Sequence, residues 1–166
     1  MMLAAAVNRT KGAILECGTG LWSTPLLHLM ANGRELLSLE TDPAWMGKFI
    51  RYERAGWHHF GLIGGKTQAE QIATWVAYGE SLSASHYADG VVFLDQSPGE
   101  ARVPMAKALK GKVKYIVAHD READIPPSGG GYGWKDLVGF FKYETIFDDV
   151  RPWTVVYSDV EEFTLG

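Results

Sequence analysis

The sequence predicts an α/β fold in which a mostly parallel sheet, covered by helices on both faces, ends in an antiparallel hairpin. Two observations predict this fold. Five apolar runs alternate with stretches of helical pattern, which is typical of βαβ units and a parallel sheet. The last two strand-like segments are separated only by residues 149–152, a connection too short for a crossover helix. We expect the parallel strands at residues 13–17, 35–40, 59–63, 90–95 and 113–119.

Length and composition favour a single domain spanning residues 1–166. The net charge of −4 gives no reason to expect binding to nucleic acid or to an anionic membrane. Cys17 is the one cysteine, so no internal disulfide can form, and we expect a buried thiol in a cytoplasmic protein. The apolar run Met1–Val7 is too short to span a bilayer, and we expect a short helix covering one edge of the sheet.

Two helices are predicted by a capping residue followed by proline in the first turn. Thr24 precedes Pro25 in the first, which Gly33 ends. Asp42 in the same way begins a helix over residues 43–55. The buried face of this second helix is expected to contain Met46, Phe49 and Ile50.

Two further helices are predicted by the spacing of a capping box. Thr67 and Glu70 have this spacing, and apolar residues follow them at helical intervals. Ser97 and Glu100 repeat the pattern after the fourth strand. We therefore expect one helix to start after each of these two pairs.

The end of the chain differs from the alternating part. Residues 142–148 and 153–158 are rich in aromatic and β-branched residues, which predicts two strands of a hairpin. Before them, residues 126–133 read as a mobile glycine-rich loop. Tyr132 and Trp134 either close over a substrate as part of a lid or anchor the loop to the surface.

The stretch Glu16–Gly20 directly follows an apolar run and is the first candidate ligand-binding turn. Glycines at positions 18 and 20 let the backbone come close to a ligand, because a side chain there would collide with it or forbid the turn. The second apolar run ends in Glu40, where a nucleotide-binding sheet holds a ribose, while Asp42 fits better as a helix N-cap.

These features together resemble the class I S-adenosylmethionine-dependent methyltransferases, whose fold is Rossmann-like. The shared features are Glu-x-Gly-x-Gly after the first strand, acids after the second and fourth strands, and the final hairpin. The resemblance implies that Gly18 and Gly20 pass beneath the cofactor. It also implies that Glu16 lies near the cofactor's amino group and that Glu40 accepts hydrogen bonds from both ribose hydroxyls.

Two positions depart from related patterns. Residues 64–67, after the third strand, contain no acid that could read the adenine amino group, so backbone or a neighbouring side chain is expected to do so. Ser23 stands where the third glycine of a dinucleotide fingerprint would fall, which counts against NAD.

Three polar side chains follow the fourth and fifth strands, namely Asp95, His119 and Asp120. Because the carboxyl ends of parallel strands meet at one edge of a sheet, we expect these side chains to converge. The pattern is similar to that of the metal-dependent catechol-type O-methyltransferases. This similarity implies Asp95 as the first metal ligand, with His119 and Asp120 replacing an Asp-Asn pair. Histidine shifts the preference from magnesium toward softer ions such as manganese.

Other roles remain open for the same residues. Without a metal, His119 is a candidate general base beside Asp95, since the ordinary pKa of histidine lies near neutral pH. Alternatively, Asp95 caps the turn after its strand and His119 pairs with Asp120 as a structural unit. Arg102, near the start of the next helix, is expected to be solvated.

The resemblance implies methyl transfer from S-adenosylmethionine to a hydroxyl of a small-molecule acceptor, with or without Mg²⁺ or Mn²⁺. The alternatives are an NAD-binding oxidoreductase and a cofactor-binding protein without enzymatic activity. The chain has no room for a substrate-capping domain, so we expect either an open site or a homo-oligomer in which another subunit completes the site.

Overall fold

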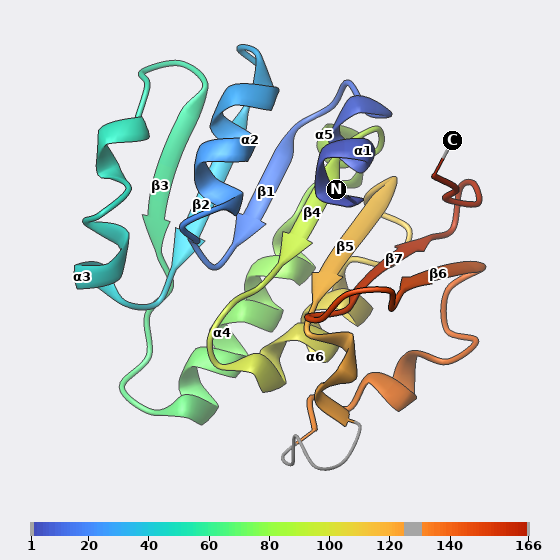
Figure 1. The fold of residues 1–166 in the computed structure, drawn as a ribbon. Helices are drawn as coiled ribbons and strands as arrows, with labels where there is room; N and C mark the ends of the chain where they lie inside the picture. Colours follow the sequence, from blue (N-terminus) through green and yellow to red (C-terminus); the bar gives the residue numbers. More distant parts are fainter. Residues whose placement is uncertain (1, 125–130, 166) are drawn as a thin grey trace.

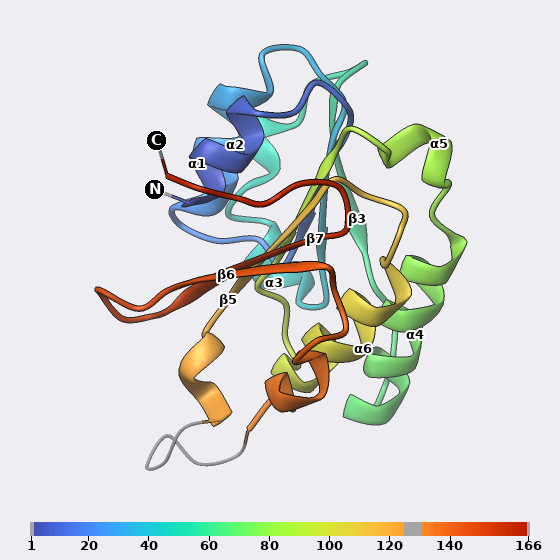
Figure 2. The same cartoon turned by 90° about the vertical axis from the view of Figure 1, so that its right-hand side faces the viewer.

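The computed structural model, which describes residues 2–124 and 131–165, contains one seven-stranded sheet of order β3-β2-β1-β4-β5-β7-β6 (Figure 1). All neighbouring strands from β3 to β5 are parallel, and β7 is antiparallel to both β5 and β6. The expected fold class, its five parallel strands and its hairpin are therefore confirmed, and Figure 2 shows the hairpin projecting from the sheet. The strands are β1 (Ile14–Cys17), β2 (Leu36–Glu40), β3 (His58–Leu62), β4 (Val91–Leu94), β5 (Tyr115–His119), β6 (Tyr143–Phe147) and β7 (Thr154–Ser158).

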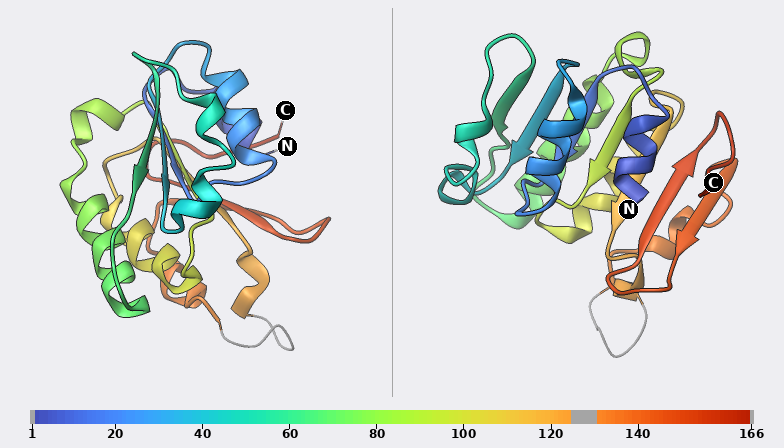
Figure 3. Two further views of the ribbon diagram at one scale, coloured as in Figure 1. Left: turned by 90° about the vertical axis from the view of Figure 1, so that its left-hand side faces the viewer. Right: turned by 45° about the horizontal axis from the view of Figure 1, so that its top comes forward.

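Helices cover both faces of the sheet. Helices α1 and α2 pack together on one face, and α4 and α6 pack together on the other (Figures 1 and 3). Short 3₁₀ helices occupy residues 50–52, 99–101, 121–124 and 134–137. The α-helices are α1 (Met2–Asn8), α2 (Ser23–Ala31), α3 (Pro43–Met46), α4 (Gln68–Ser81), α5 (Ala84–Tyr87) and α6 (Arg102–Ala108). None of the helices in the described ranges is long and apolar enough to cross a membrane.

Strand β4 shows why the strand sequences are continuously apolar. Val91 and Phe93 belong to the core beneath α1 and α2, whereas Val92 and Leu94 belong to the core beneath α4 and α6. Successive side chains of a strand point to opposite faces, so a strand covered on both faces needs apolar residues at every position. Cys17 lies in the second of these cores and is fully buried, as expected.

The N-terminal helix differs from its expected position. Helix α1 contacts β4 and β5, two inner strands, and therefore covers a face of the sheet and not its edge. Four of its residues are buried against that face: Met2, Leu3, Ala6 and Val7. Its apolar side chains bury more surface over inner strands than an edge could offer.

The helix expected at residues 43–55 is much shorter. Asp42 caps α3 as predicted, since its Oδ1 accepts hydrogen bonds from the backbone N–H groups of Ala44 and Trp45. The α-helix ends at Gly47, a residue type that weakens a helix interior. The expected buried face is also wrong, because Phe49 is buried whereas Ile50 is exposed.

One of the two predicted capping boxes is present. The Thr67 hydroxyl accepts a hydrogen bond from the Glu70 N–H, and the Glu70 carboxylate accepts one from the Thr67 N–H, at 3.2 Å each. The box at Ser97 and Glu100 is absent, and no side chain caps the short helix that follows. Ser97 instead lies in a loop, and its backbone carbonyl accepts a hydrogen bond from Trp75 Nε1.

Two tryptophans, one buried and one exposed, show how much burial in the core contributes to the free energy of unfolding. Trp75, on α4, is 0% exposed, and Trp22 is 88% exposed. We expect Trp75→Ala to lower the free energy of unfolding by about 3–5 kcal/mol, through lost burial and the cavity left behind. The control Trp22→Ala should change it by less than about 0.5 kcal/mol. Urea unfolding of the two variants checks this, and equal losses would contradict the assignment of the core.

Candidate functional site

The glycines after β1 let three segments pack closely. Gly18 has a φ of +90°, and a Cβ there would lie 2.5 Å from the carbonyl oxygen of Asp95. A Cβ on Gly20 would lie 2.6 Å from the Oγ of Ser23, in the first turn of α2. The turn therefore needs glycine at position 18, which rests against the backbone after β4, whereas at position 20 the Ser23 hydroxyl could rotate away.

Glu16 lies beneath this turn and is 0% exposed. Its carboxylate accepts hydrogen bonds from Thr24 Oγ1 at 3.0 Å and from Ser38 Oγ at 2.6 Å. Thr24 Oγ1 in turn accepts a hydrogen bond from the Gly20 N–H at 2.9 Å. Burial raises the pKa of Glu16 to about 7. The sequence suggested Thr24 as the N-cap of α2, and this prediction is wrong. The Thr24 hydroxyl instead connects the buried Glu16 carboxylate to the turn above it.

A chain of polar groups continues from Glu16 toward the surface of α2. Ser38 Oγ lies 3.1 Å from His58 Nε2, and His58 Nδ1 lies 2.9 Å from His28 Nδ1. Burial lowers the pKa of His58 to about 4 and also lowers that of His28. The two imidazoles therefore satisfy the polar groups beside Glu16 in their neutral form. Sequence reasoning missed this chain because its members lie on three different elements.

Glu40, at the end of β2, connects the turns that follow β1 and β2. Its Oε2 accepts hydrogen bonds from the N–H and the hydroxyl of Thr19, both at 2.9 Å. Its Oε1 accepts them from the N–H of Thr41 at 2.7 Å and of Asp42 at 3.2 Å. Trp45 Nε1 donates to the carbonyl of Thr19 at 2.7 Å, which further fixes the first turn.

A cavity of about 390 Å³ lies over these two turns. Its wall combines carboxylates, hydroxyls and one indole ring, a set suited to a polar ligand with an attached ring. Glu16, Gly18 and Gly20 do not contribute to the wall, although they hold the turn in place. The lining residues are Thr19, Glu40, Thr41, Asp42, Trp45, Asp95 and Ser97.

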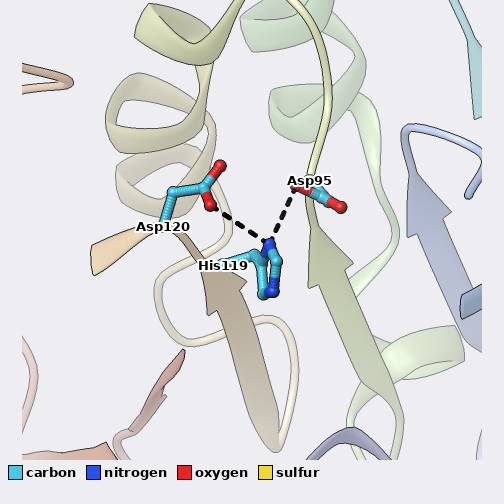
Figure 4. Close-up of side chains that lie close together, drawn as sticks. All are labelled: Asp95, His119 and Asp120. Atoms are coloured by element: carbon cyan, nitrogen blue, oxygen red, sulfur yellow. Dashed lines mark ion pairs between the residues drawn. The ribbon is translucent and has the colours of Figure 1, made fainter. Parts of the chain in front are cut away.

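The structure brings Asp95, His119 and Asp120 together at the ends of β4 and β5 (Figure 4). His119 Nδ1 lies 3.5 Å from Asp95 Oδ1 and 3.3 Å from Asp120 Oδ1. Burial alone would lower the pKa of His119, but the hydrogen bonds and charges of Asp120 and Asp95 raise it to about 9. Hydrogen bonding from His119, together with Arg102, lowers the pKa of Asp120 to about 2. His119 is therefore a cation at neutral pH.

Arg102 completes this cluster, contrary to the expectation of a solvated side chain. It is only 5% exposed. One guanidinium nitrogen lies 2.9 Å from Asp95 Oδ1 and the other lies 2.7 Å from Asp120 Oδ2. An arginine seven residues after a strand-ending acid was the available signal in the sequence, but the helix between them conceals which way it points.

A metal ion fits this cluster by distance but not by charge. The three side chains offer ligand atoms within 4.8 Å of one another, so such a group could hold an ion. Both carboxylates, however, already form ion pairs with Arg102. A divalent ion would add two positive charges beside a guanidinium that balances the acids already, so the residues do not fit it.

A second cavity, of about 210 Å³, lies on the other side of His119. It has more apolar wall than the first. His119 borders this cavity and Asp95 borders the first, so these two side chains, in contact with each other, lie between the two spaces. The lining residues are Met2, Leu3, Trp22, Ser23, Leu26, Phe93, His119 and Thr154.

Two aromatic residues near the glycine-rich loop anchor the cluster. Trp134 is fully buried, and its Nε1 donates to the carbonyl of Asp120 at 3.0 Å. The Arg102 guanidinium carbon lies 4.9 Å from the centre of the Tyr132 ring, so the ring covers the guanidinium. These contacts attach both aromatic rings to the cluster, and the lid role stays a prediction. The loop expected at residues 126–133 falls, up to residue 130, outside the described residues.

Comparison with family models and with curated proteins finds no match for this sequence. Solved structures do match. A candidate O-methyltransferase from Klebsiella pneumoniae has a TM-score of 0.62 at 17% identity, over 95% of this chain and 77% of that one. The fibrillarin pre-rRNA processing protein of Methanococcus jannaschii has a TM-score of 0.60 at 17% identity, over 95% and 74%. Spermidine synthase of Thermotoga maritima has a TM-score of 0.59 at 9% identity, over 94% and 56%.

At these identities the similarity concerns the fold. The strand order and the antiparallel β7 are those of the class I S-adenosylmethionine-dependent methyltransferases, so the likeness expected from the sequence is confirmed at the level of structure.

Substituting Gly18 and Gly111 by alanine distinguishes the cost of backbone strain from the cost of a steric clash. Gly111 has a φ of +71° with open space at the Cβ position, whereas a Cβ on Gly18 would meet backbone. Gly111→Ala should cost about 1 kcal/mol for its left-handed backbone alone, and Gly18→Ala clearly more than about 2 kcal/mol. Denaturant unfolding measures both, and a Gly18→Ala loss no greater than that of Gly111→Ala would refute the close approach.

The ion pairs of His119 predict a dependence of stability on pH. Its pKa rises from 6.5 in the unfolded chain to about 9 in the fold, so its stabilising effect is complete below pH 6.5 and disappears as the pH rises through about 9. We expect His119→Asn to remove this loss, while His59→Asn, at an exposed histidine, retains it. Urea unfolding across this pH range checks the sign. An imidazole that titrates near its ordinary pKa in NMR spectra would contradict it.

Proposed function

We propose that the protein transfers a methyl group from S-adenosylmethionine to a hydroxyl of a small-molecule acceptor. The observation that supports this most strongly is the polar cavity at the carboxyl ends of β1 and β2, with Asp95 on its wall. In open α/β sheets, ligands bind beyond the carboxyl ends of the strands. The sheet order of a methyltransferase supports this cofactor over NAD.

The residues of the cavity fit the nucleoside part of the cofactor. Glu40 and Asp42 offer carboxylate oxygens to the ribose hydroxyls, and Trp45 offers a ring edge or face to the adenine. The oxygens of Glu40 already accept hydrogen bonds from Thr19 and Thr41. A bound ribose would share these oxygens, which the two turns hold in a set orientation.

Asp95 is the residue placed to receive the proton of the acceptor. When bound, the cofactor supplies an electrophilic methyl group on a positively charged sulfur. With the cofactor and the acceptor bound, Asp95 would orient the acceptor hydroxyl and take its proton on a carboxylate oxygen. The contacts of Arg102 and His119 both fall on Oδ1 of Asp95. Among the described residues, no hydrogen bond or ion pair reaches the other oxygen, Oδ2, which can take the proton.

His119 acts in this scheme as a cation that orients Asp95, because its raised pKa leaves it protonated at neutral pH. The cavity on its other side suits a small acceptor with an apolar body. An acceptor in that cavity could direct its hydroxyl toward the contact between His119 and Asp95.

Calorimetric titration with S-adenosylhomocysteine, the demethylated cofactor, tests the proposed site directly. We expect one molecule to bind each chain, and Glu40→Gln to weaken binding by about tenfold to a hundredfold through loss of a charged acceptor. The matched control Glu53→Gln, at an exposed acid away from the cavity, should leave binding unchanged.

The same titration separates the alternatives. Binding of NADH in place of the demethylated cofactor would favour an oxidoreductase. Cofactor binding without methylated product across a broad acceptor screen would favour a binding protein without enzymatic activity. Methylated product that disappears in Asp95→Asn would support the proposed role of Asp95.

A further inference from the structure

The position of Arg102 goes beyond a supporting role for one acid. The guanidinium group contacts one oxygen of Asp95 at 2.9 Å and one oxygen of Asp120 at 2.7 Å, through two different nitrogens. It also donates to the carbonyl oxygens of Gln96 at 3.2 Å and His119 at 3.0 Å. All four acceptors belong to the segments that end β4 and β5, so one cation gathers both strand ends.

This is the arrangement that a divalent ion would otherwise create. An ion bound by the same two carboxylates would lie roughly 2.0–2.6 Å from their oxygens. The guanidinium nitrogens already contact one oxygen of each carboxylate, within hydrogen-bonding distance. An ion would therefore compete with the guanidinium for the same two carboxylate groups, and their like charges would repel each other.

The guanidinium is also held in place from outside the cluster. The ring of Tyr132 covers it at 4.9 Å. A Cβ on Gly99 would run into that same ring, so glycine at this position lets the ring lie close. A side chain enclosed in this way cannot swing out to make room for an ion without moving Tyr132.

We propose that the Arg102 guanidinium takes the place of a divalent metal ion in this site and that the site works without metal. Arg102 is then a positioning residue that brings Asp95 and Asp120 to one rim, as an ion would. Removing its charge leaves two neighbouring carboxylates beside the His119 ring, a set of ligands that binds Mn²⁺ when the ring gives up its proton. The inference does not depend on which reaction the site performs.

The test is a Mn²⁺ titration followed by the electron paramagnetic resonance signal of the free ion, on the whole protein. In the wild type we expect no loss of the free-ion signal at Mn²⁺ concentrations up to about 1 mM. Arg102→Met should gain one Mn²⁺ site whose dissociation constant lies at least about tenfold below that concentration. Arg102→Lys retains the positive charge but not the two guanidinium nitrogens that contact both carboxylates. It should still exclude most of the Mn²⁺. Lys107→Met, at a half-exposed lysine on the same helix, is the matched control and should behave as the wild type.

Two results would overturn the proposal. One is a stoichiometric Mn²⁺ site in the wild type that Asp95→Asn or Asp120→Asn removes. The other is a folded Arg102→Met variant, by circular dichroism, that binds no more Mn²⁺ than Lys107→Met. If Arg102→Met does not fold, the wild type and Arg102→Lys still decide, because Mn²⁺ bound by either at its Asp95–Asp120 pair contradicts the proposal. Methyl transfer is not measured, so failure here leaves the proposed function standing.

Discussion

Two acids that follow neighbouring parallel strands are joined by one buried guanidinium, and the rim of the sheet takes its shape from this contact. Asp95 and Asp120 lie near each other because the paired parallel strands β4 and β5 end at the same rim of the sheet. Without a cation between them their charges would repel, and burial would oppose their ionised forms. Arg102 comes from the helix that connects the two strands, so the chain itself supplies the balancing charge. Breaking such a pair leaves an uncompensated charge, which is far more costly than the pair is stabilising.

The first half of the sheet solves the same problem with neutral donors. Glu16 and Glu40 are both buried at the ends of β1 and β2, and hydroxyl and backbone N–H groups satisfy them. The two acids face different partners. Glu16 holds its turn from below with a raised pKa, whereas Glu40 connects two turns on the wall of a cavity. Carboxylates that are buried or half-buried thus shape both the cavity and the cluster beside it.

The fold was largely predictable because its signals are local. Strands buried on both faces read as continuous apolar runs, and a four-residue connection leaves only a hairpin. Helix lengths were less predictable. Asp42 correctly marked a helix start, yet Gly47 ended the helix after one turn. Ser97 has the spacing of a cap, but the loop uses its carbonyl to accept from Trp75, a residue on another helix. Local patterns state what a segment prefers, and tertiary contacts decide which preference is realised.

The sequence by itself determined the positions of the strands along the chain, the turn after β1 and the meeting of Asp95, His119 and Asp120 at one edge. These follow from the apolar periodicity and from the rule that parallel strands end at the same edge of a sheet. Only the tertiary structure decided what each polar group faces. It turned Glu16 inward to Thr24, directed Arg102 onto two acids and made His119 a cation. Such choices depend on burial and on partners distant in sequence, which residue spacing does not encode.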